Sequence, residues 1–373
     1  MKSKQQKPLK KVRICLVGSH KPYPAFDSVL SILKEILGSK YVMELRIKDL
    51  SVKTPHILKP ICILLQDVAL YLKIMSNYKR GFNAVLIFQG YYPLTCIGLK
   101  ISRIKLLLYI GGSAFFWSHF ENTSTLGRIL VYSNLPLENI CHKSADMIIT
   151  LSRNMVKLLQ IEKNKDKTYF ALPRLDKNFK NFRIIEKYDS RKNVVGYLGA
   201  LVKRKGILNF IEAIRIIERT KTDCKYVIVG GGPLLGTVKA KVRSYGLENK
   251  VKVTGFVDYH DLVKYFNEMK LYVLPSYAEG VPSTIFEAMA CGTPVLATPV
   301  GAIPDVIRDG ETGFLLKSNG PKHIADKIIE LLNKPELLEK VSINAYNYVR
   351  EDFSYEKTLE SWRKIIREIE AKK

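Results

Sequence analysis

Short apolar runs rich in β-branched residues alternate along the chain with longer segments whose apolar positions recur at helical spacing. This alternation predicts an α/β protein in which helices wrap parallel sheets. In the first part of the chain we expect strands at 11–19, 41–47, 83–90, 104–112, 146–152 and 167–173. In the second part we expect them at 194–201, 225–231, 250–257, 270–276, 293–300 and 312–316.

A polar, charge-rich segment separates the two series of strands. The chain of 373 residues is long enough for two domains of ordinary size, each with its own core. We therefore expect two doubly wound, Rossmann-like domains facing across a cleft, which is the natural place for a site. The expected limits are 1–173 for the N-terminal domain, 174–193 for a linker, 194–350 for the C-terminal domain and 351–373 for a helix that packs back on the first domain.

The most apolar long stretch lies at 57–75. Its proline and its ionisable residues, Asp67 and Lys73 among them, argue against a membrane-spanning helix, because each ionised group at bilayer depth costs a few kcal/mol. One interpretation is a buried or two-sided core helix. The other is a helix that lies partly in a membrane interface, helped by the neighbouring Lys79 and Arg80.

The charge is strongly positive and unevenly distributed. The chain has 60 Lys and Arg against 35 Asp and Glu, a net charge of +25. Up to residue 190 there are 31 basic and 13 acidic residues, net +18, and the remainder has 29 and 22, net +7. Such a field favours phospholipid headgroups, a pyrophosphate-bearing substrate or nucleic acid. We exclude nucleic acid because no aromatic-interleaved RNA motif, zinc finger or helix-turn-helix pattern is present. A generally solvated, lysine-rich surface is the alternative.

The cysteines and the N-terminus bear on the compartment. The six cysteines are scattered without paired spacing, which is typical of reduced, mostly buried thiols in a cytoplasmic protein. The N-terminal segment is basic, but the apolar run that follows has only the length of a strand. It matches neither a signal peptide nor a membrane span.

Two glycine-containing strand ends in the second part suggest an anion site. The segment "VGGGPLLG" ends a strand and opens a helix, which exposes backbone N–H groups, although its spacing does not fit a dinucleotide fingerprint. The segment "LGALVKRKG" places Lys203, Arg204 and Lys205 after Gly199. These cations fit either a pyrophosphate clamp or a solvated charge run.

The segment "SYAEGVPSTIFEAMACGTPV" adds two carboxylates. Glu279 lies in a loop rich in Gly and Pro, and Glu287 follows eight positions later inside a predicted helix. We expect Ser283 or Thr284 to cap that helix, which Gly292 terminates. The helix start favours phosphate, and carboxylates accept hydrogen bonds from sugar hydroxyls. A ligand with both groups is a nucleotide sugar.

These motifs together closely resemble family 4 of the retaining glycosyltransferases, which have the GT-B fold. The resemblance rests on the spacing of Glu279 and Glu287, the run "EAMACGTPVLATPVGAIPDVIRDGETGFLL", "VGGGP", "VTGFV" and the Lys205–Gly206 pair. It is dense over 194–317 and thinner before. It implies transfer of a sugar from a nucleoside-diphosphate sugar to an acceptor hydroxyl, with the first domain on the acceptor side.

The resemblance also implies roles for individual residues. Glu279 would contact the hydroxyls of the donor sugar, Glu287 would hold the ribose, and Lys205 would pair with the diphosphate. Lys205, Glu279 and Arg204 are the implied catalytic residues. The implied donor-binding positions are Gly18, Gly199, Lys205, Gly231, Phe256, Val257, Glu279, Gly280, Val281, Pro282, Ser283, Thr284 and Glu287.

The second domain departs from the family pattern at two positions. Ala200 stands where the family has an arginine, so we expect Arg204 or Lys203 to supply the missing cation. Asp305 stands where a glutamate is common.

The first domain departs more. It has only Gly18 where the family has a glycine-rich loop, and it has glycines where a histidine is expected. His20 and His119 are the nearest imidazoles, and with Ser113 they are the acceptor-side candidates.

For the mechanism we expect front-face attack, in which the leaving diphosphate helps to deprotonate the acceptor. Neither a metal nor another cofactor is required, and the sequence contains no Asp-x-Asp pair. We expect a lipid-linked or cell-envelope acceptor and a cytoplasmic enzyme held peripherally on the anionic inner face of the membrane. The alternatives are a phosphorylase or sucrose-type enzyme on soluble substrates and a non-catalytic nucleotide-sugar-binding protein.

Overall fold

The structure is a computed structural model that describes residues 12–19, 24–47, 59–88, 90–111, 134–171, 177–220 and 222–371. These residues form two compact units. The first unit contains the described residues up to 171 together with 356–371, and the second contains those from 177 to 355. The two units are considered separately below.

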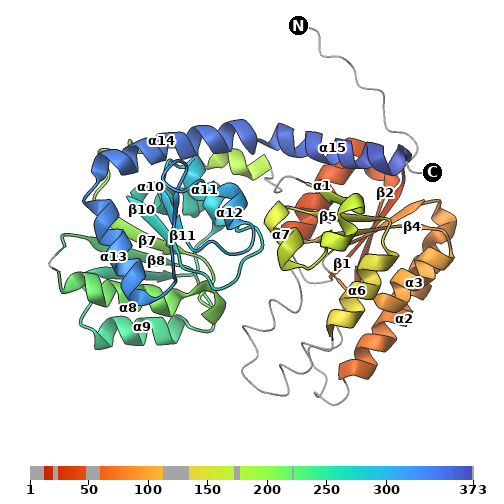
Figure 1. Cartoon of the computed structure of the whole chain (residues 1–373), viewed down its shortest axis with the longest axis horizontal. Helices are drawn as coiled ribbons and strands as arrows, with labels where there is room; N and C mark the ends of the chain where they lie inside the picture. Colours follow the sequence, from red (N-terminus) through yellow and green to blue (C-terminus); the bar gives the residue numbers. More distant parts are fainter. Residues whose placement is uncertain are drawn as a thin grey trace, which may run out of the picture. The chain divides into compact units, whose positions relative to one another are not determined.

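The first unit is built on a six-stranded parallel sheet with the order β2-β1-β3-β4-β5-β6 (Figure 1). Apolar side chains fill its central strands because both faces are covered by helices. Its strands are β1 (Ile14–Ser19), β2 (Val42–Ile47), β3 (Ala84–Phe88), β4 (Lys105–Ile110), β5 (Met147–Thr150) and β6 (Thr168–Phe170). Its helices include α1 (Pro24–Leu37), α2 (Lys59–Asn77), α3 (Pro93–Ile101), α6 (Asn134–Ser144) and α7 (Arg153–Leu158).

The second unit has its own six-stranded parallel sheet, with the order β12-β11-β10-β7-β8-β9 (Figure 1). Its strands are β7 (Val194–Leu198), β8 (Lys225–Val229), β9 (Val251–Gly255), β10 (Leu271–Leu274), β11 (Val295–Ala297) and β12 (Phe314–Leu315). Its α-helices are α8 (Ile207–Glu218), α9 (Leu235–Ser244), α10 (Leu262–Glu268), α11 (Ser283–Ala290), α12 (Ile303–Val306), α13 (Pro321–Leu332) and α14 (Pro335–Asp352). The order reverses between β7 and β10, which is the place where ligands bind in such sheets.

Each strand expected from the sequence is confirmed, although the strands are shorter than expected. The apolar runs continue past the last ladder pair into loops that are themselves buried. Leu201, for example, is fully buried although β7 ends at Leu198. Burial extends past the strand ends because these loops close over the edge of the sheet.

The last helix belongs to the first unit. Helix α15 (Tyr355–Ala371) places Trp362 against Tyr109 of β4, with ring centroids 6.0 Å apart and planes 15° apart. The Lys105 ammonium donates to the carbonyl oxygen of Ile369 at 2.6 Å. The chain therefore returns to the sheet of the first unit after completing the second.

The apolar stretch expected at 57–75 forms α2 and is only partly buried. Asp67, Leu70 and Ile74 point inward, while several large apolar residues of the same helix are exposed. The helix is therefore not buried on all sides, and the interpretation as a helix in a membrane interface stays a prediction. Within the described ranges, no helix has the length and apolar character that crossing a bilayer requires.

The segment expected as a linker is packed into the second unit over its described part. Phe179, Phe182 and Tyr188 are buried, and the Asn267 side chain accepts hydrogen bonds from the N–H groups of Ile185 and Glu186. The aromatic residues between the charges of this segment anchor it to the second unit.

Arg191, at the end of this segment, is a buried cation that joins two helix ends. Its guanidinium donates to the carbonyl oxygen of Cys291 at 2.6 Å and to that of Met269 at 3.1 Å. Met269 and Cys291 are the C-caps of α10 and α11. A cation stabilises these ends because the last carbonyl groups of a helix carry partial negative charge. Burial lowers the pKa of Arg191, but an arginine starts so high that it stays charged.

We predict that Arg191→Met destabilises the second unit, because buried carbonyl groups at two helix ends lose their donor. The expected loss is about 3 kcal/mol, or roughly 6 to 12 °C in the unfolding midpoint of a unit of this size. The measurement is thermal unfolding of the full chain. Lys192→Met is the matched control, since Lys192 is exposed. Equal midpoints for the two variants would contradict the anchoring role.

Candidate functional site

The carboxyl ends of the parallel strands of the second unit meet at one edge of its sheet. Backbone hydrogen bonds join the loops there. The N–H of Leu201 donates to the carbonyl oxygen of Gly231 at 2.9 Å, and that of Gly230 donates to Gly255 at 2.9 Å. The loops after β7, β8 and β9 are therefore fixed beside one another, and this brings together the predicted residues Gly199, Gly231 and Phe256.

A buried ion pair lies at the point where the strand order reverses. Lys205, in the loop after β7, places its ammonium 2.7 Å from Oε1 of Glu279, in the loop after β10. The side chains are 13% and 4% exposed. The Ser276 hydroxyl donates to the same carboxylate oxygen at 2.6 Å. The site therefore presents a cation and a carboxylate that are held before any ligand arrives.

Close backbone contacts hold both members of this pair. Gly206 follows Lys205 with a φ of +69°, and a Cβ there would lie 2.0 Å from the carbonyl oxygen of Pro275. Gly301 has a φ of +61°, and a Cβ there would lie 2.0 Å from the carbonyl oxygen of Glu279 itself. Only glycine fits at either position, so the loops that carry Lys205 and Glu279 have little freedom.

Helix α11 begins at Ser283, and its N-cap is Pro282. The expected cap by Ser283 or Thr284 is therefore wrong, because the N-cap position is occupied by Pro282, which makes no side-chain cap hydrogen bond. The Thr284 hydroxyl instead lies 2.9 Å from the hydroxyl of Tyr272 in β10. Burial raises the pKa of Tyr272 well above its usual range, so this phenol keeps its proton. The start of α11 retains N–H groups suited to an anion.

Glu287 is the second carboxylate. It lies one helical turn beyond Ser283 and is buried. The Tyr259 hydroxyl donates to its Oε1 at 3.3 Å. A buried carboxylate requires such partners, because its desolvation otherwise costs several kcal/mol. The loop residues Gly280 and Val281 connect the two glutamates, and the N–H of Ala302 donates to Gly280 at 2.9 Å.

The three consecutive cations after β7 have different surroundings. They form one turn of 3₁₀ helix, Lys203–Lys205, in which Lys203 is exposed and Arg204 is half-buried. The carbonyl oxygen of Arg204 accepts from the N–H of Tyr277 at 2.8 Å, which fixes this turn to the loop after β10. Compensation for Ala200 by Arg204 or Lys203 stays a prediction.

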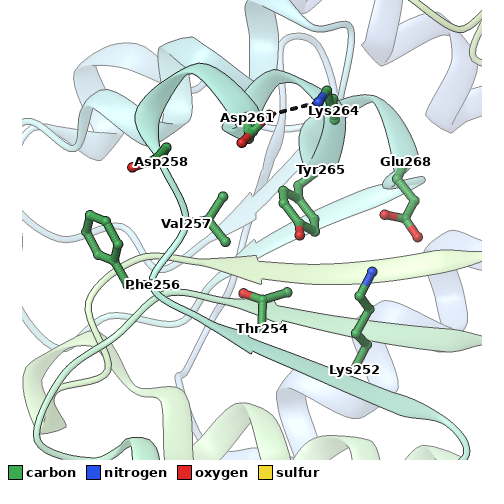
Figure 2. Close-up of a pocket in the computed structure, with 9 residues that line it drawn as sticks. All are labelled: Lys252, Thr254, Phe256, Val257, Asp258, Asp261, Lys264, Tyr265 and Glu268. Atoms are coloured by element: carbon green, nitrogen blue, oxygen red, sulfur yellow. Dashed lines mark hydrogen bonds and ion pairs between the residues drawn. The ribbon is translucent and has the colours of Figure 1, made fainter.

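A pocket of about 630 Å³ lies between β9 and α10 (Figure 2). Phe256 and Val257 line it at one end, and Phe256 is 82% exposed. The other described lining residues are Lys252, Thr254, Asp258, Asp261, Lys264, Tyr265 and Glu268. Lys205 and the two glutamates are not among them. The pocket therefore adjoins the candidate site only through Phe256 and Val257.

The candidates of the first domain are less informative. Gly18 lies in β1 and packs against Phe26 of α1, where a Cβ would lie 2.2 Å from a ring carbon. This contact explains the glycine by packing, and a role in donor binding stays a prediction. His20, Ser113 and His119 lie outside the described residues.

Several residues that shape the site were not predicted. Ser276 stands three positions before Glu279, a spacing in which a hydroxyl meets a carboxylate, and this was a readable signal. Tyr259 and Tyr272 had no such signal, because they come from other strands and loops. Their contacts depend on the sheet order.

Comparisons with known proteins find similar sequences and similar folds. The family model described as "Glycosyl transferases group 1" matches residues 156–348. An uncharacterized glycosyltransferase of Methanocaldococcus jannaschii is 26% identical over 304 residues, which cover 78% of this chain and 76% of the relative.

Two solved structures share the fold. A sucrose-phosphate synthase from Thermosynechococcus elongatus superposes with a TM-score of 0.75 at 18% identity, over 97% of this chain and all of that chain. HepE of Anabaena, solved in complex with UDP, gives a TM-score of 0.74 at 16% identity, over 96% of this chain and all of that chain. The family model covers half of the chain, including Lys205, Glu279 and Glu287, so the chain belongs to the glycosyl transferases group 1 family and has the GT-B fold.

Proposed function

We propose that this glycosyltransferase moves a sugar from a nucleoside-diphosphate sugar to an acceptor hydroxyl with retention of configuration. The buried pair of Lys205 and Glu279 is the observation that supports this most strongly. A buried ion pair contributes little net stability, because desolvation of the two ions offsets their attraction. Its position, where the strand order of the sheet reverses, is better explained by the binding of a charged ligand.

The ligand groups follow from the charges of the site. Glu279, in the loop before α11, is an acceptor for the hydroxyls of a donor sugar. Glu287, within α11, is an acceptor for the ribose. Lys205 and the start of α11 supply positive charge for the diphosphate between them. The UDP bound by HepE, which has the same fold, supports a nucleoside diphosphate as the ligand class.

The transfer step needs no nucleophile from the protein in this proposal. The acceptor oxygen bonds to the anomeric carbon on the face from which the diphosphate leaves, and the bond from that carbon to the phosphate oxygen breaks. The acceptor proton passes to the leaving diphosphate. Lys205 and the first-turn N–H groups of α11 stabilise the negative charge that develops there. No metal or other cofactor takes part in the proposed step.

The ion pair also has to rearrange when the donor binds. At present the ammonium of Lys205 neutralises Glu279 at 2.7 Å. A diphosphate within reach of Lys205 would compete for this ammonium, and sugar hydroxyls would then replace it at the carboxylate. Binding of the sugar and of the diphosphate is therefore coupled. The diphosphate draws Lys205 away from Glu279, and the sugar hydroxyls then satisfy the carboxylate that is left.

For the acceptor we propose a lipid-linked or cell-envelope glycan, reached by a cytoplasmic enzyme at the inner face of the membrane. The support is the net charge of +18 up to residue 190, which suits an anionic surface. Transfer to a lipid acceptor in detergent is the direct test. Phosphorolysis, or transfer only to a soluble sugar, would contradict this choice of acceptor.

The first prediction for this function concerns the donor. Among uridine, guanosine and adenosine diphosphate sugars, one base should raise the unfolding midpoint of the full chain. A ligand at about one hundred times its Kd stabilises by about 2.7 kcal/mol. The sugar conjugate should give a larger shift than the bare nucleoside diphosphate. If none of the three bases shifts the midpoint, the chain does not bind these donors.

The second prediction separates the two glutamates. Glu279→Gln should abolish the extra shift given by the sugar but keep binding of the bare diphosphate, and Glu287→Gln should weaken both. Loss of a charged hydrogen bond costs roughly 1.5 to 3 kcal/mol, which is about tenfold to a hundredfold in Kd. The amide keeps the shape of each side chain and limits damage to the fold. Similar small effects of both variants on donor affinity would refute the assigned roles.

The third prediction concerns the cations after β7. Lys205→Met should weaken binding of the nucleoside diphosphate by about tenfold or more, because the site loses its paired cation. Lys203→Met should weaken binding less than Lys205→Met, since Lys203 is exposed. Arg204→Met should weaken binding as much as Lys205→Met only if Arg204 takes the role of the family's arginine, whose position Ala200 occupies here. Unchanged affinity in all three variants would exclude a diphosphate clamp at this turn.

A further inference from the structure

Helix α2 presents an exposed apolar face to the surface of the first unit. Asp67, Leu70 and Ile74 repeat at helical spacing and point inward. On the remaining surface, five large apolar residues are between 41% and 62% exposed: Ile63, Leu64, Leu65, Val68 and Leu72. A helix of a soluble protein ordinarily carries polar residues on that side.

Buried polar contacts fix α2 in this orientation. The Asp67 carboxylate accepts from the N–H of Leu94 at 2.7 Å and from the N–H of Thr95 at 2.8 Å. The Thr95 hydroxyl donates back to the Asp67 carbonyl at 2.9 Å. Asp67 therefore caps the start of α3, and rotation of α2 to bury its outer face would break this cap.

Helix α3 continues the apolar surface. Leu94, Ile97 and Ile101 follow one another at helical spacing and are between 39% and 77% exposed. The two helices lie side by side (Figure 1), and the ring of Tyr71 packs over Gly98 between them. We call the exposed apolar residues of both helices the α2–α3 face: Ile63, Leu64, Leu65, Val68, Leu72, Leu94, Ile97 and Ile101.

The exposed charged residues of α2, α3 and their adjoining turns that the structure describes have one sign. From 59 to 103 the only acidic residue is Asp67, and its carboxylate is buried in the cap. No further acidic residue occurs before Glu121. The exposed cations of the same two helices and their adjoining turns are Lys73, Lys79, Arg80, Lys100 and Arg103. An apolar surface whose own helices expose cations is complementary to an anionic bilayer, which offers acyl chains and anionic headgroups together.

We propose that the α2–α3 face docks this protein on an anionic lipid bilayer, with its apolar side chains in the interface and the neighbouring cations at the headgroups. The proposal deepens the proposed function by naming the surface that brings the enzyme to a lipid-linked acceptor. It rests on that function for the acceptor, whereas lipid binding itself can be measured without any donor.

The experiment is flotation of the full chain with vesicles of equal parts phosphatidylcholine and phosphatidylglycerol. Binding should be strong at low salt, fall as salt is added, and be weak on phosphatidylcholine alone. Replacement of Leu65, Leu72 and Ile101 together by Gln should reduce binding by about tenfold or more. Replacement of Lys79, Arg80 and Lys100 by Gln should reduce it and remove most of the salt dependence.

Matched controls come from the second unit. Ile343→Gln removes an apolar side chain of similar exposure, and Lys239→Gln removes an exposed cation. Neither should alter flotation. Wild-type protein that ignores the anionic vesicles, or face variants that float like the controls, would overturn the proposal. So would sedimentation that shows the apolar triple variant turning a dimer into a monomer with flotation unchanged, because the face would then be an interface between copies.

The donor measurements keep the two proposals apart. The face variants should retain the thermal shift given by the nucleotide sugar, since none of the substituted residues belongs to the Lys205–Glu279 site. Loss of flotation with retained donor binding locates the docking surface. Flotation by a chain that binds no nucleotide sugar would refute the proposed function and leave the docking surface standing.

Discussion

The buried carboxylate of Glu279 imposes the main constraint on the second unit. It must be paired to be buried, and both Lys205 and Ser276 are directed at the same oxygen, Oε1. To reach it, the loop after β7 has to approach the loop after β10 so closely that Gly206 lies against the carbonyl oxygen of Pro275. The order of the strands makes this approach possible, because β7 and β10 are neighbours while their connections diverge to opposite sides.

The short helix α11 is held at one end and open at the other. Its C-terminal carbonyl groups receive hydrogen bonds from Arg191 and from Ser342, whose hydroxyl donates to Gly292 at 2.6 Å. Its N-cap residue, Pro282, makes no side-chain hydrogen bond to the first turn. Fixing the C-terminal end positions the open N-terminal end without covering it. Glu287 lies between the two ends, so the anchor at Arg191 also orients this carboxylate.

Asp67 shows that the first unit uses a buried carboxylate differently. Its two oxygens accept from two N–H groups at the start of α3, which satisfies it without a cation. The consequence is structural, since α2 and α3 are fixed as a pair with their apolar sides outward. A carboxylate removed from the surface in this way also leaves the surrounding cations unopposed. The same contact therefore determines both the orientation and the charge of the α2–α3 face.

How much the sequence could predict depends on the range of each interaction. Periodicity and β-branched runs are local properties, and they predicted the strands of both sheets. The spacing of Glu279 and Glu287 is also local, and with Lys205 it predicted the site and the family. The packing of 174–193 was not predicted, because the contacts of Arg191 with Met269 and Cys291 join segments far apart in the chain.

Local patterns also failed where a side chain had two possible partners. Thr284 was expected to cap α11, but Tyr272 of the adjacent strand lies beside its hydroxyl. The stretch 57–75 was apolar enough to be a core helix, and the cap from Asp67 to α3, together with the burial of Leu70 and Ile74, decides which side faces out. The sequence by itself therefore determined the elements, the fold class and the glutamate and lysine positions, since these follow from neighbouring residues. The tertiary structure alone decided which buried polar groups meet, because that depends on how distant segments pack.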